Sequence, residues 1–128
     1  MAPASTTLHE PADQLKPETI NIHRAIVSLI EEMEAIDWYH QRAEACTDGQ
    51  LRAILKHNME EEIEHATMTL EWIRRKLPKF DETLRTYLFT AGEITEIEEA
   101  EDDGKEPLAK PRRSSLRTTI GNMKGSGS

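Results

Sequence analysis

The chain has 128 residues, a formal net charge of −8, 31% charged residues and 5% aromatic residues. This length fits a single domain, and the many charges and few aromatic side chains favour an all-α fold over a β-sheet. The negative charge argues against a nucleic-acid partner, because binding to phosphates needs a basic surface. Cys46 is the only cysteine, which excludes an intrachain disulfide and leads us to expect a reducing, cytoplasmic setting.

Residues 1–15 are mostly small and polar, without a basic start or an apolar run. We therefore expect a flexible N-terminus with no signal peptide and no membrane-spanning segment.

Two long helices are predicted next. Pro17 suits the first turn of a helix that we expect to run from about residue 17 to 45. A Thr47-Asp48-Gly49 turn follows, in which Asp48 or Thr47 can cap a second helix over about residues 50–76, ending before Pro78. Because the turn is short, the two helices should form an antiparallel hairpin. The first helix carries a core stripe with helical spacing: Ile22, Ile26, Leu29, Met33 and Ile36.

The C-terminal part of the chain changes in character. Residues 80–89 have helical spacing and predict a short third helix ended by Gly92, and residues 93–100 can add one or two further turns. We therefore assign residues 16–100 to the helical domain. Residues 101–128 pass from acidic to basic and Ser-rich, with little to bury, and are predicted to be a disordered linker.

The first helix has a second apolar line on its opposite side, formed by Ile20, Val27, Trp38 and Ala45. A helix that is apolar on two faces needs two partners, and a hairpin supplies one. Two helices also bury little surface by themselves. We therefore predict a symmetric homodimer that completes a four-helix bundle.

Glu62 interrupts the apolar stripe of the second helix. At about 100° per residue, it lies within roughly 40° of the stripe residues Leu51, Leu55, Ala66, Thr69 and Ile73. A carboxylate in such a place is costly unless it is paired. His65 follows at i+3, and a Glu-x-x-His pair is what diiron carboxylate bundles use to bind metal.

One chain has the ligands for half of such a site. On the first helix, Glu32 lies closest to the core stripe, and Tyr39 follows on nearly the same line. Glu31 and Glu34 point towards Trp38, where they predict a second, weaker cation site. A dimer would supply four Glu and two His, a set that suits Fe or Mn and tolerates Zn, with Ca as a further alternative. Oxidation of Fe(II) by O2 is the simplest reaction for this site.

Other readings of these residues stay open. Glu60, Glu61 and Glu64 are expected on a solvated helix face, and His23, His40 and His57 are expected to be structural because no carboxylate has a convincing spacing to them. An all-α nucleotide pyrophosphohydrolase also forms dimeric bundles, but it binds Mg through carboxylates alone. A non-catalytic helical adaptor would need a Lys or Arg to pair with Glu62.

The chain resembles the encapsulated ferritins, the short ferritin-like cargo of encapsulin shells, along roughly residues 9–90. The resemblance is carried by LHEP, HRAIVSLIEEMEAIDWYHQR, HNMEEEIEHATMTLEWIRR and LRTYLF. It implies an antiparallel hairpin that dimerises into a ferritin-like four-helix bundle and then into an open decameric ring. It implies a ferroxidase centre built from Glu32, Glu62 and His65 of both subunits, with Tyr39 close by.

The same resemblance gives roles to two further parts of the chain. It places a second metal site at Glu31 and Glu34, near Trp38, on the route by which iron reaches the centre. It also implies that the tail ends in a peptide that docks on the encapsulin shell, so that the protein acts inside the nanocompartment. The residues that resemble this peptide are Thr119, Ile120, Gly121 and Met123.

Overall fold

The structure, a computed structural model, describes residues 6–103, and every regular element in this range is helical. A short 3-10 helix, Ala12–Gln14, precedes helix α1, Pro17–Ala45, and helix α2, Gly49–Lys76. Helices α3, Pro78–Tyr87, and α4, Ile94–Asp102, follow. The predicted all-α fold is confirmed. The predicted linker and docking peptide after residue 103 lie outside the described residues.

The ends of the two long helices follow from local sequence signals. Pro17 is the first residue of α1, where its missing N–H costs nothing. The side chain of Asp48 caps α2, because its Oδ1 accepts a hydrogen bond of 2.9 Å from the backbone N–H of Leu51. Such a cap is worth about 1 kcal/mol. At the other end of α2, three basic residues face the negative end of the helix dipole: Arg74, Arg75 and Lys76.

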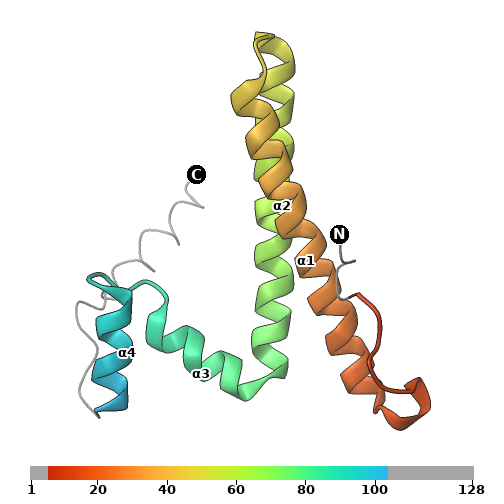
Figure 1. The fold of residues 1–128 in the computed structure, drawn as a ribbon, viewed down its shortest axis with the longest axis vertical. Helices are drawn as coiled ribbons and strands as arrows, with labels where there is room; N and C mark the ends of the chain where they lie inside the picture. Colours follow the sequence, from red (N-terminus) through yellow and green to blue (C-terminus); the bar gives the residue numbers. More distant parts are fainter. Residues whose placement is uncertain (1–5, 104–128) are drawn as a thin grey trace, which may run out of the picture. The chain divides into compact units, whose positions relative to one another are not determined.

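Helices α1 and α2 pack against one another as the predicted antiparallel hairpin. Figure 1 shows them side by side near the connecting turn and separating towards the N-terminal end of α1. Ala43 on α1 and Ala66 and Ile73 on α2 are buried. The packing holds the middle of α1 beside the middle of α2, where the candidate site lies.

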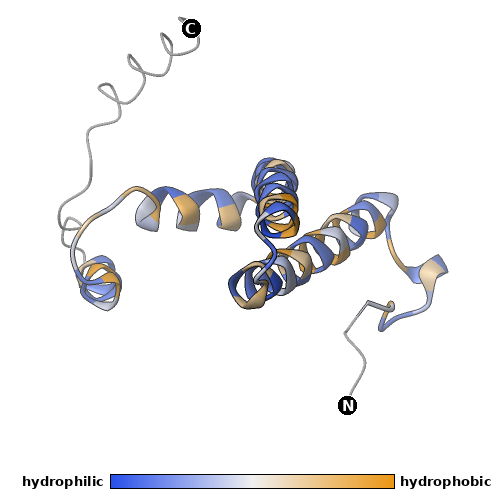
Figure 2. Ribbon diagram, turned by 90° about the horizontal axis from the view of Figure 1, so that it is seen from above, coloured by the Kyte–Doolittle hydropathy of each residue, from blue (hydrophilic) through white to orange (hydrophobic). Residues whose placement is uncertain are grey.

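A single hairpin covers only part of its apolar surface. In the predicted core stripe of α1, Leu29 and Ile36 are half-buried, but Ile26 and Met33 remain 40% and 55% exposed. Trp38, on the second apolar line, is 51% exposed, and Met68 on α2 is 61% exposed. Figure 2 shows hydrophobic and hydrophilic residues interspersed along both helices. The hairpin therefore has apolar surface left for another partner. The exposure of Trp38 agrees with the predicted second apolar line, whereas the prediction that Ile26 and Met33 are core residues is wrong for the single hairpin.

The chain divides into two compact units, the first ending at Phe80 and the second beginning at Asp81. The second contains most of α3 and all of α4, in which Ile97 is fully buried. Helix α3 ends earlier than expected. Phe89 adopts a left-handed backbone with φ 63°, a conformation that commonly ends helices and usually falls to glycine, so Gly92 is not needed as the stop.

Candidate metal centre

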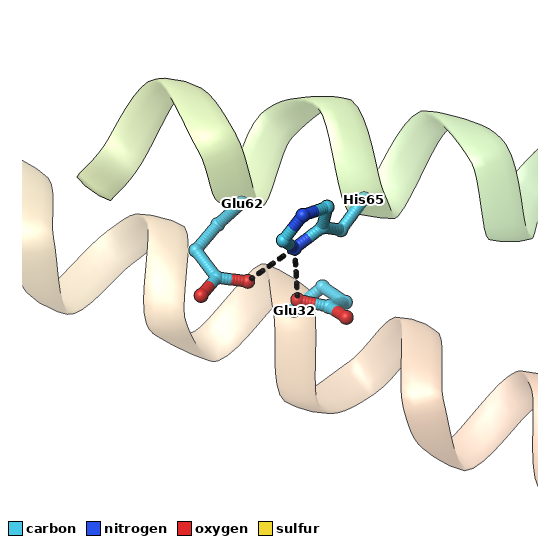
Figure 3. A group of neighbouring side chains, drawn as sticks. All are labelled: Glu32, Glu62 and His65. Carbon is cyan, nitrogen blue, oxygen red and sulfur yellow. Dashed lines mark ion pairs between the residues drawn. The ribbon is translucent and has the colours of Figure 1, made fainter. Parts of the chain in front are cut away.

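Three side chains from two helices converge in the middle of the hairpin. Glu32 comes from α1, and Glu62 and His65 come from successive turns of α2 (Figure 3). The Nδ1 atom of His65 lies 3.5 Å from Oε1 of Glu62 and 3.9 Å from Oε1 of Glu32. One ligand atom from each residue can be chosen so that all lie within 4.8 Å of one another. Residues predicted from the helical spacing of each helix are thus brought together across the hairpin.

The electrostatics of this group show two carboxyl groups held too close for their charges. A hydrogen bond with Glu62 raises the pKa of Glu32, and desolvation and the charge of Glu62 raise it further. His65 acts in the opposite direction, while the charge of Glu31 adds to the rise. Two carboxylates that share a site disfavour each other's ionisation. A cation between them would relieve that repulsion.

The donor set matches a first-row transition metal. Carboxylate oxygens and one imidazole nitrogen suit Fe or Mn and accept Zn. Donors at about 2.1 Å from one ion are at most about 4.2 Å apart. The three ligand atoms lie within 4.8 Å of one another, so only small side-chain rotations are needed to bring them to one ion.

The group is open on one side. The side chains of Glu32 and Glu62 are 26% and 25% exposed, and that of His65 is 46% exposed. Three donors are fewer than the four that even a tetrahedral metal takes. In one copy of the chain, the arrangement therefore provides part of a coordination sphere.

The other predicted site residues do not join this group in the single chain. Tyr39 is half-buried, and the guanidinium of Arg42 lies 5.4 Å from the centre of its ring. Glu31 and Glu34 are exposed. Among the described residues, the trio above is the one group in which three potential metal donors converge. Trp38 lines a separate shallow depression, together with Gln41 and Arg42.

One contact departs from the sequence-based expectation. Glu61, expected on a solvated face, is half exposed, but its carboxylate lies 3.9 Å from Nε2 of His65 and 3.8 Å from Nε2 of His57. The statement that His57 has no carboxylate partner is therefore wrong. Both pairs have the i, i+4 spacing that brings helix side chains together, so the signal was present in the sequence.

A helical hairpin with carboxylate and histidine donors on facing helices defines a class of metal-binding bundle proteins. The EncFtn-like family model matches residues 7–91, and the chain belongs to this family. It is 60% identical over 105 residues to the "Encapsulated ferritin-like protein" of Rhodospirillum rubrum, covering 82% of this chain and 75% of that protein. It is 53% identical over 98 residues to the "Ferritin-like protein" of Thermotoga maritima, covering 77% and 86% of the two chains.

A solved structure agrees in fold as well as sequence. A protein of Nitrosomonas europaea with a known crystal structure is 56% identical, with a TM-score of 0.66. The match covers 68% of this chain and 96% of that one. None of the helices in residues 6–103 combines the length and apolar character needed to cross a bilayer.

Proposed function

We propose that this protein is a ferroxidase that oxidises Fe(II) to Fe(III) with O2 at a dinuclear site shared by two copies of the chain. The observation that carries the proposal is the convergence of Glu32, Glu62 and His65, with two carboxyl groups crowded enough to raise the pKa of Glu32. Such a group favours a divalent cation over an empty site. Membership of the EncFtn-like family supports Fe(II) as that cation.

The second copy follows from the incomplete donor set. A diiron bundle site needs two Glu-x-x-His pairs and two single Glu residues, and one chain has one of each kind. A two-fold axis beside the trio would double it to four Glu and two His. Met68, one turn after His65, is 61% exposed and would be covered by the same contact. Metal binding and dimerisation should therefore support one another.

The residues would act by holding the substrate ions and moving charge. Glu32 and Glu62 would supply oxygen ligands and hold two Fe(II) ions close together, so that both can give an electron to the same O2 molecule. The Nδ1 atom of His65 faces both carboxylates and would be its ligand atom. Tyr39 would lie beside this centre, and Glu31 and Glu34 would bind iron on its way in, near Trp38.

We further propose that the protein is cargo of an encapsulin shell in the cytoplasm and assembles there into a decameric ring. The support is the 60% identity to a relative named an encapsulated ferritin-like protein and the residues that resemble a docking peptide: Thr119, Ile120, Gly121 and Met123.

The two alternative functions have less support. A pyrophosphohydrolase would use carboxylates alone, whereas here Nδ1 of His65 points at both Glu32 and Glu62 (Figure 3). In an adaptor, Glu62 would need a Lys or Arg as a partner, but among the described residues its ion pair is with His65.

One experiment separates these functions. Metal-free protein is mixed with Fe(II) without oxygen, its mass is measured by light scattering, and air is then admitted while ferric absorbance is followed. The proposal expects iron-dependent association followed by oxidation. Glu64→Ala, an exposed position on the same helix, is the matched control for Glu62→Ala. Oxidation at equal rates by the two variants would rule out the assigned site.

The cargo role has its own test. Co-expression with an encapsulin, with and without residues 114–124, should give loaded shells only with the full tail. Equal loading of the two proteins would contradict docking through this peptide.

A further inference from the structure

The two ring nitrogens of His65 face different carboxylates. Nδ1 faces Glu62 at 3.5 Å and Glu32 at 3.9 Å, inside the candidate site. Nε2 faces Oε1 of Glu61 at 3.9 Å, outside it. Glu61 therefore contacts His65 without belonging to the group of converging donors.

This division matches what a metal-binding histidine requires. A neutral imidazole carries one proton, and the nitrogen that binds metal must be the one without it. The proton must then be on the other nitrogen, and in metal sites that N–H almost always donates to a carboxylate, a carbonyl or water. Here the side chain beside Nε2 is the Glu61 carboxylate.

The other oxygen of Glu61 also has a neighbour. Its Oε2 lies 3.8 Å from Nε2 of His57, one helical turn earlier. The carboxylate is thus bracketed along α2 by two imidazoles at i−4 and i+4. Its side chain is half exposed, so it can rotate by the roughly 1 Å that separates 3.9 Å from a hydrogen bond.

We propose that Glu61 is a positioning residue of the metal centre: it accepts the Nε2–H of His65, and so presents Nδ1 to the metal between Glu32 and Glu62. This rests on the proposed function, since it takes the trio to be a metal site. Glu61 itself does not touch the metal. It acts through His65 by fixing which nitrogen is free and how the ring is turned.

The test compares substitutions at Glu61 with one at Glu64, which is exposed and carries the same charge in the same turn. Zn²⁺ is the probe because it does not change oxidation state, so its affinity is measured apart from oxidation. Glu61→Leu should weaken Zn²⁺ binding by roughly 10-fold or more, as loss of such a partner usually does. Glu61→Gln should lose less, because its amide oxygen still accepts the Nε2–H. Glu64→Leu should stay close to the wild type.

A spectroscopic measurement separates positioning from a general effect on the fold. In the Co²⁺-loaded protein, the ring N–H of a coordinated histidine gives a shifted proton resonance that disappears in D2O. This resonance should be seen in the wild type and in Glu61→Gln, and should be lost to rapid exchange with water in Glu61→Leu. Helicity by circular dichroism should be the same in all variants.

The outcomes distinguish this inference from the function on which it rests. If Glu61→Leu binds Zn²⁺ as tightly as Glu64→Leu while the wild type binds metal and oxidises iron, Glu61 has no positioning role and the metal centre stands. If the wild type binds neither Zn²⁺ nor Fe(II), the metal centre itself is wrong, and the role of Glu61 falls with it.

Discussion

Helix α2 contains two glutamates whose surroundings are opposite. Glu71 accepts hydrogen bonds of 2.8 Å and 2.7 Å from the guanidinium groups of Arg74 and Arg75, one turn further on. These bonds lower its pKa to about 2. Glu62 instead faces another carboxyl, Glu32, and raises the pKa of that neighbour.

The difference indicates which carboxylates are structural. Glu71 has its counter-charges at i+3 and i+4 in its own helix, so its charge is satisfied whenever the helix forms. Glu32 and Glu62 have a half-exposed histidine and no such complement of cations. The charge of one carboxylate therefore disfavours that of the other, and in the proposed metal site a bound cation would relieve this repulsion. Carboxylates that are to bind a metal ion cannot already be neutralised by Arg or Lys side chains, as Glu71 is.

The largest effect should come from removing a ligand. Glu62→Ala and His65→Ala should each reduce Fe(II) oxidation by more than about 100-fold, the upper end of the effect of losing an outer partner of a metal ligand. Both should also abolish metal-dependent association, because each removes two donors from the shared site. Initial rates of ferric absorbance and light-scattering mass measure these effects. If both variants still associated on addition of metal, association would not depend on Glu62 or His65.

Glu32→Gln should have opposite effects on stability with and without metal. Without metal, it removes one of two crowded carboxylates and should stabilise the hairpin by less than about 1 kcal/mol. With metal at about 100 times the wild-type Kd, the wild type should gain about 2.7 kcal/mol, and the variant should gain almost nothing. Thermal unfolding with chelator and with Zn²⁺ measures both. A variant that is less stable in chelator would show that Glu32 is not strained in the metal-free chain.

The helix ends and the Glu62–His65 pair could be predicted because each depends on residues close together in one helix. Pro17, Asp48 and Pro78 mark helix ends through their own backbone or side chain, so the hairpin could be drawn from them. The Glu62–His65 pair was visible because a charge interrupts an apolar stripe, and both residues lie on the same helix. Pairing them with Glu32 needed only the rule that the stripes of two packed helices face each other.

Other features depended on information that spacing does not contain. Ile26 and Met33 belong to the same stripe as Leu29, yet they remain exposed in the hairpin. The spacing of apolar residues along α1 does not show how much of this surface α2 covers. Glu61 differs from these, because its i, i+4 spacing to His57 and His65 could be read from the sequence; hydropathy alone places it on the solvated face. Phe89, just after the end of α3, has a backbone conformation that favours glycine, and its side chain does not predict this conformation.

Glu71→Gln tests the structural half of the comparison and should have a smaller effect. It keeps the shape of the side chain but removes the charge that Arg74 and Arg75 surround. We expect the melting temperature to fall by a few degrees, since exposed ion pairs contribute little. Fe(II) oxidation per folded protein should not change, because Glu71 lies outside the candidate site. A loss of oxidation would show that the two regions are not independent.

The smallest effects should appear in the pH dependence of the metal-free chain, with opposite signs for the two regions. The lowered pKa of Glu71 contributes stability that is present above its ordinary value of 4.5 and is lost as the pH falls towards about 2. The raised pKa of Glu32 means that the folded chain holds its proton more tightly than the unfolded chain. Its contribution is therefore fully present below 4.5 and is lost as the pH rises through the raised value.

These signs can be measured separately with the two glutamine variants. Melting temperatures in chelator, followed from about pH 3 to about pH 7 across the ordinary carboxyl range, should show a steeper acid loss in the wild type than in Glu71→Gln. The decline above pH 4.5 should be weaker in Glu32→Gln. Affinity for Zn²⁺ should rise over that same upper window, because the proton on Glu32 must leave before metal binds. If loss of the Glu32 proton both destabilises the hairpin and permits metal binding, the repulsion between the Glu32 and Glu62 carboxylates is linked to the proposed function.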